Sequence, residues 1–122
     1  MTRPTAVPRT LFDKIWHAHR IVEREDGQSL LYVDSHFIQD GSAPAFEMLR
    51  RRGLKVRTPQ RGFATADHYV PTSSRDLASI ADPEKRAMAD ALRNDSQEHG
   101  ITFFGLDDPR QGIVQWSGPN RA

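Results

Sequence analysis

The sequence predicts an α/β fold with a mainly parallel sheet and flanking helices. Segments typical of strands alternate with segments typical of helices along most of the 122 residues. Such alternation favours parallel strands joined by crossover helices. A chain of this length accommodates one layered domain at most.

The first two predicted helices are marked by their caps and apolar spacing. One follows Thr10, a suitable N-cap, and its apolar stripe comprises Leu11, Phe12, Ile15, Trp16 and His19. The other is predicted to start with Ser42 as N-cap and Pro44 in the first turn, and to end in the basic residues 50–52 and Gly53. Its buried stripe should comprise Ala45, Phe46 and Leu49.

A third helix is predicted from Asp82 and Pro83 to about His99, where Gly100 can adopt the left-handed C′ conformation. Its apolar stripe should comprise Ala87, Met88, Ala91 and Leu92.

Short apolar runs bounded by turn residues predict the strands. Residues 29–33 follow a turn at Asp26 and Gly27, and their uninterrupted apolar run predicts a strand covered on both faces. Residues 62–70 read as a strand that runs into a loop and stops at Pro71. Residues 101–104 and 112–114 complete the set, with a turn at 107–109 between them. The tail, 117–122, is loop-like, so we expect a domain truncated at its C-terminal end.

Composition excludes several classes of function. The 17 basic and 16 acidic residues give a net charge of +1, which favours neither nucleic acid nor an anionic membrane. Cysteine is absent, which removes disulfides and thiolate-ligated metal sites. No run approaches the ~18 apolar residues of a membrane span. We therefore expect a cytoplasmic protein with a flexible leader, residues 1–9.

Histidines and carboxylates are the remaining candidates for chemistry, because no common phosphate-binding, hydrolase or calcium motif is present. Asp67 and His68 are adjacent near the end of a predicted strand, where a carboxylate can hold an imidazole for proton transfer. His17 and His19 should diverge on their helix. Asp34 and His36 resemble half a metal site without an evident third ligand, and Gln39 could simply bind loop backbone.

The order of these pieces resembles the start of isopropylmalate dehydratase large subunits, which belong to the aconitase family. The similar stretches are residues 10–16, 31–36, 63–72 and 107–114. The resemblance spans almost the whole chain and implies that residues 10–122 form the N-terminal portion of an aconitase-type domain.

The resemblance implies a hydro-lyase that moves a hydroxyl between adjacent carbons of a branched 2-hydroxy diacid. Such enzymes use a [4Fe–4S] cluster as Lewis acid. His68 would protonate the departing hydroxyl, Asp67 would pair with it, and Gln39 would contact substrate. The cluster cysteines would come from the remainder of the large subunit, and a small subunit would complete the site.

Two positions depart from that pattern, since this branch usually has histidine at positions 39 and 115 and this chain has Gln39 and Gln115. Glutamine keeps hydrogen bonding at position 115 but cannot exchange a proton at neutral pH. Three hypotheses remain: part of a hydro-lyase for isopropylmalate or a related diacid, a non-catalytic binding module, and a nucleic-acid binder using the basic residues between 50 and 61.

Overall fold

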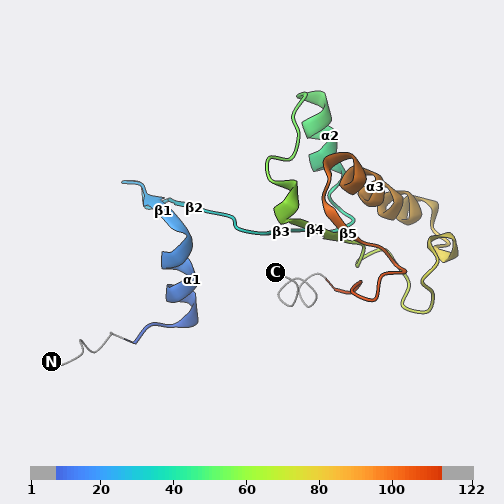
Figure 1. Cartoon of the computed structure of the whole chain (residues 1–122), viewed down its shortest axis with the longest axis horizontal. Helices are drawn as coiled ribbons and strands as arrows, with labels where there is room; N and C mark the ends of the chain where they lie inside the picture. Colours follow the sequence, from blue (N-terminus) through green and yellow to red (C-terminus); the bar gives the residue numbers. More distant parts are fainter. Residues whose placement is uncertain (1–7, 114–122) are drawn as a thin grey trace. The chain divides into compact units, whose positions relative to one another are not determined.

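The computed structural model describes residues 8–113, which divide into two compact units, one ending at Asp34 and the other beginning at Ser35 (Figure 1). The expectation of one aconitase-type domain over residues 10–122 remains a prediction. Within the described residues, no helix is long and apolar enough to cross a membrane.

The N-terminal unit consists of helix α1 (Leu11–His19) and a hairpin of strands β1 (Arg20–Glu23) and β2 (Ser29–Leu31). The predicted cap of α1 is confirmed. The Thr10 side chain accepts from the Asp13 backbone N–H at 3.1 Å, and the Asp13 carboxylate accepts from the Thr10 N–H, which together form a capping box. The hairpin turns at Gly27, whose φ is +81°.

The strand predicted at 29–33 is confirmed as the shorter β2, but the expectation that it is covered on both faces is wrong for this unit. Leu30 is 55% exposed and Val33 is 68% exposed, and strand β2 pairs with β1 alone among the described residues. No described residue from 8 to 34 is buried. Large apolar side chains are instead exposed throughout the unit: Leu11, Phe12, Ile15, Ile21, Val22, Leu30, Leu31, Tyr32 and Val33.

The second unit contains the predicted parallel sheet, in the order β3 (His36–Ile38), β4 (Gly62–Thr65) and β5 (Thr102–Phe104). Ile38 pairs in register with Ala64, and Ala64 with Phe103. Helix α2 (Ala43–Arg51) joins β3 to β4, and helix α3 (Pro83–His99) joins β4 to β5. The two helices lie together on one side of the sheet (Figure 1). The parallel α/β architecture is thereby confirmed.

Short 3₁₀ turns, Pro59–Arg61 and Leu77–Ser79, precede β4 and α3. The core of the unit lies between the sheet and the two helices. It comprises Ile38, Phe46, Ala64, Ala66, Ile80, Ala89, Leu92 and Ile101.

The predicted ends of α3 are confirmed. The Asp82 carboxylate accepts from the Glu84 and Lys85 N–H groups at 2.9 and 3.3 Å, and Gly100 closes the helix with φ +72°. The predicted stripe is partly wrong, because Ala87 is exposed while Ala89 is buried. Leu92 lies in the core as expected.

The predicted cap of α2 is wrong. Ser42 already has helical backbone angles and its side chain makes no capping hydrogen bond, so Pro44 near the start is the confirmed signal at this end. Gly53 has the expected positive φ of +62°. The predicted strand at 112–114 is not formed at Gly112 and Ile113, and Val114, like the 117–122 tail, lies outside the described residues.

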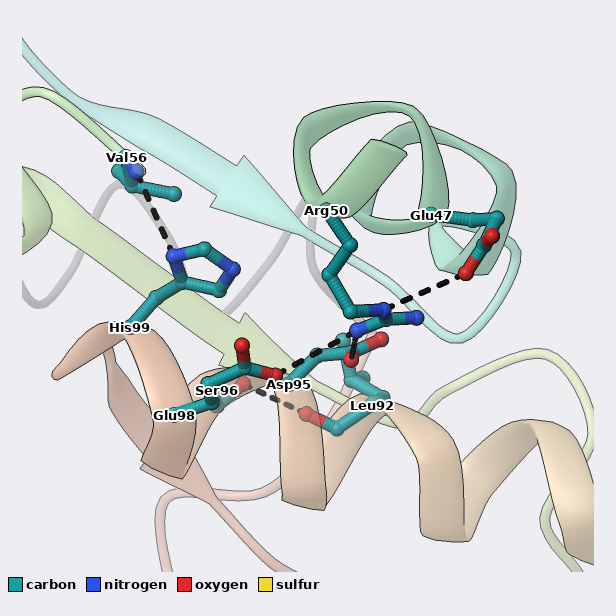
Figure 2. Close-up of polar contacts among 8 residues, drawn as sticks. All are labelled: Glu47, Arg50, Val56, Leu92, Asp95, Ser96, Glu98 and His99. Carbon is teal, nitrogen blue, oxygen red and sulfur yellow. Dashed lines mark hydrogen bonds and ion pairs between the residues drawn. The ribbon is translucent and has the colours of Figure 1, made fainter. Parts of the chain in front are cut away.

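Helices α2 and α3 are joined by a polar network around Arg50 (Figure 2). The Arg50 guanidinium donates to the buried Asp95 carboxylate at 2.6 Å and also reaches Glu47 and Glu98 at 3.3 and 3.5 Å. On the same face of α3, the buried His99 ring accepts the Val56 N–H at 3.3 Å and packs on Phe46. The basic end of α2 is therefore partly structural rather than simply solvated.

Candidate active site

The carboxyl ends of the parallel strands bring the candidate residues together. Gln39 and Asp40 directly follow β3, and Asp67 and His68 follow β4, the central strand. Adjacent parallel strands end at the same edge of a sheet, which is where open α/β folds place their sites. Residues 28 apart in sequence, Asp40 and His68, are in hydrogen-bonding contact there.

Asp67 and His68 form a close pair, as the sequence suggested. The Nδ1 atom of His68 lies 2.5 Å from Oδ1 of Asp67, whose side chain is almost fully buried, whereas that of His68 is 51% exposed. Because a carboxylate only accepts, Nδ1 carries the proton and Nε2 is left as the nitrogen that can gain or lose one.

The pKa of the His68 imidazole is raised above its ordinary value. The hydrogen bond to Asp67 is the main cause, and the negative charges of Asp67 and Asp40 add to it, while partial desolvation acts in the opposite direction. The ring therefore remains cationic to higher pH than a free histidine, which is the state required of a general acid.

Asp40 is a member of this cluster that the sequence offered only as a weak candidate beside Gln39, with no role of its own. It is 1% exposed, and its carboxylate accepts from the backbone N–H groups of Tyr69 at 2.9 Å and His68 at 3.4 Å. Its Oδ1 lies 3.7 Å from His68 Nδ1. Its place two residues after β3 gave no signal in the sequence, because that short strand was not predicted.

The Gln39 side chain is engaged by its own loop, because Oε1 accepts from the Gly41 N–H at 2.7 Å. This is the backbone role that the sequence left open for it. The role of Gln39 in substrate contact remains a prediction.

Two hollows flank the pair. Asp67 lines one of about 220 Å³, together with Arg75 and Gln111, and His68 lines another of about 330 Å³, together with Lys85 and Asp82. At the first hollow, a hydrogen bond connects two segments of the chain, because Gln111 donates from Nε2 to the Ala66 carbonyl at 2.8 Å. The half-exposed His68 ring is thus accessible to a small solute.

Asp40, Asp67 and His68 also form a group of potential metal ligands, with donor atoms within 4.8 Å of one another. The hydrogen bonds already described account for this proximity. An iron–sulfur cluster does not fit the donors of this chain, because clusters are held chiefly by thiolates and the sequence contains no cysteine.

The other candidates belong to other elements. In the N-terminal unit, the Asp34 carboxylate accepts from Nε2 of His19 at 3.0 Å, and His17 is exposed on α1. His36 is the first residue of β3, in the second unit, and pairs with Gly62. The carboxylate of Asp34 therefore pairs with His19, whereas the sequence suggested His36 as its neighbour. Gln115 lies outside the described residues.

A parallel βαβαβ unit with an acid–histidine pair at the carboxyl edge of its sheet has the arrangement of open α/β folds, whose sites lie at that edge. Residues 13–121 match the aconitase family (aconitate hydratase), and this chain belongs to that family. The chain is 46% identical over 112 residues to the 3-isopropylmalate dehydratase large subunits of two strains of Thermus thermophilus.

These matches cover 91% of this chain but 24% of each relative, so the chain spans about a quarter of the length of these curated relatives. No solved structure matches the chain.

Proposed function

We propose that this chain forms the first part of the large subunit of a hydro-lyase that interconverts 2-isopropylmalate and 3-isopropylmalate by dehydration and rehydration. The named relatives support the substrate class, and leucine biosynthesis is the corresponding pathway. The proposal retains the sequence expectation of a cytoplasmic enzyme. The single observation that carries it is the His68 imidazole held by Asp67 at the carboxyl edge of the sheet.

His68 is the proton donor in this proposal. Its Nε2 gives a proton to the hydroxyl oxygen as the C–O bond breaks, while a base from the rest of the assembly takes the proton of the neighbouring carbon and the C=C bond forms. In the reverse direction Nε2 takes a proton from the water that adds, and the other carbon is protonated. Asp67 holds Nδ1 and stabilises the cationic ring, which raises the pKa of His68, so the proton stays at Nε2 to higher pH than in a free histidine. Gln39 is retained as a substrate contact, which requires it to release the Gly41 N–H or to use its amide nitrogen.

The remainder of the large subunit and a small subunit are the proposed partners, with a diacid as substrate. A [4Fe–4S] cluster bound by the remainder would supply Lewis acidity, and no residue of this chain offers a thiolate for it. We therefore expect the 122-residue chain alone neither to assemble a cluster under anaerobic iron and sulfide nor to turn over isopropylmalate.

The test is a turnover assay of the complete large subunit that carries this sequence, reconstituted anaerobically with the small subunit. His68→Gln should lower kcat by about 10²–10⁴-fold, the range that general acid–base catalysis contributes. His17→Gln is the matched control, because His17 is an exposed histidine outside the cluster.

The pH profile adds a second criterion. Activity that needs cationic His68 should decline as pH rises through the raised pKa of that ring, and Asp67→Asn should move the decline to lower pH. Full turnover by His68→Gln, or no isopropylmalate conversion by the wild-type assembly, would refute the proposed function.

A further inference from the structure

We propose that Asp40 is a positioning residue for His68: its buried carboxylate fixes the backbone of the loop after β4 and thereby the site of the proton donor. This inference rests on the proposed function for its catalytic consequence. Its structural part concerns Asp40 and the loop alone.

The contacts of Asp40 converge on one peptide segment. Its two carboxylate oxygens accept from consecutive backbone N–H groups, Oδ1 from His68 and Oδ2 from Tyr69. Consecutive N–H groups aimed at one anion orient the backbone firmly, because each would otherwise need another acceptor. The direction in which the His68 side chain leaves its loop is therefore set by a residue of another loop, the one that follows β3.

The buried Asp40 carboxylate also acts on His68 through its charge, which adds to the larger effect of Asp67. The carboxylate is 1% exposed, so its charge is screened less by water than that of a surface group. Its Oδ1 atom lies 3.7 Å from Nδ1 of His68, which is the nitrogen that is already bonded to Asp67. Two carboxylates thus favour the cationic ring, and only Asp67 makes the direct side-chain bond.

Other charged and titratable groups near His68 set the background for any test. Tyr69 lies beside it, with ring centroids 6.4 Å apart, and Lys85 and Asp82 line the hollow that His68 opens on. Asp40 bonds to the loop rather than to Lys85 or Asp82, whose charges stay when it is substituted, whereas Tyr69 shares the loop that Asp40 holds. A change in the titration of His68 therefore reports the lost carboxylate together with any movement of that loop.

The experiment compares Asp40→Asn and Asp40→Ala with Asp95→Asn, first in the 122-residue chain. Asp40→Asn keeps the shape but has one acceptor oxygen and no charge. Asp95→Asn is the matched control, because Asp95 is a similarly buried aspartate whose partner is Arg50 on α2. The measurements are the NMR titration of the His68 ring and amide hydrogen exchange at His68 and Tyr69.

With Asp40→Asn, the His68 titration should move to lower pH and the His68 amide should exchange faster. With Asp40→Ala, the Tyr69 amide should also exchange faster. Asp95→Asn should lower the denaturation midpoint without either change. An unmoved His68 titration in a folded Asp40→Asn chain would overturn the proposal, and so would loss of folding in both Asp40 variants while Asp95→Asn stays folded, since that is a purely structural role.

In the complete, reconstituted enzyme, Asp40→Asn should lower kcat by about 10²-fold with little change in KM, because a displaced acid affects the chemical step more than binding. Unchanged kcat in the presence of a shifted His68 titration would overturn the catalytic part. Absence of isopropylmalate turnover in the wild type would instead refute the proposed function, and the NMR results would still decide whether Asp40 positions His68.

Discussion

Leu92 offers a quantitative test of the described core. It is 2% exposed on α3 and belongs to the core cluster between the helices and the sheet. Leu92→Ala removes about three carbon groups, a transfer loss of about 2.4 kcal/mol at ~0.8 kcal/mol each. The cavity that remains adds to this, so we expect a total of about 3–4 kcal/mol.

The assay is urea unfolding followed by far-UV circular dichroism, which reports the long helix α3. For a small unit with a stability of roughly 5–10 kcal/mol, this loss should lower the midpoint greatly. Leu54→Ala is the matched control, because Leu54 is in the same unit and is 47% exposed, so its truncation should cost about 1 kcal/mol. Equal costs at the two positions would refute the core assignment.

Caps, backbone angles and an ion pair give three further predictions. Asp82→Ala should cost about 1 kcal/mol of unfolding free energy because two N–H groups lose their acceptor, whereas Ser42→Ala should stay within about 0.5 kcal/mol; equal losses would contradict the observed caps. Gly100→Ala should cost about 1 kcal/mol from its φ of +72° alone, since an added Cβ meets no atom within 4 Å; an unchanged midpoint would contradict that backbone conformation. In the N-terminal unit, His19 donates to Asp34 and to the Ile15 carbonyl, and these bonds raise the pKa of the ring. The stabilising contribution is thus full below about pH 6.5, the ordinary value. It is lost as pH rises through the raised value, so amide exchange in α1 should accelerate over that range, and Asp34→Asn should weaken this dependence.

Local signals predicted the elements whose ends are defined by short-range chemistry. Thr10 with Asp13, and Asp82 with Pro83, predicted the starts of α1 and α3 because capping involves residues a few positions apart. The prediction that Ser42 caps α2 was wrong because residue type alone does not decide whether a side chain accepts a hydrogen bond from the first turn of a helix. Its backbone had already entered the helical region.

The short strands β1 and β3 were not predicted, because a strand of three or four residues carries little pattern and is stabilised by distant partners. The same limit applies to the site. Asp67 and His68 are neighbours in sequence and were found, whereas Asp40 acts on a loop 28 residues away. Its burial emerges only when β3 and β4 pair.

None of the residues 8–34 is buried, so the stability of the N-terminal unit depends on whether another surface binds to it. Apolar side chains such as Phe12 and Val33 gain little free energy from folding while they remain in water. A surface that covers them would bind the folded form and stabilise it in proportion to the logarithm of its concentration. The melting temperature of this unit is therefore not a constant of the sequence. It should rise with the concentration of that covering surface.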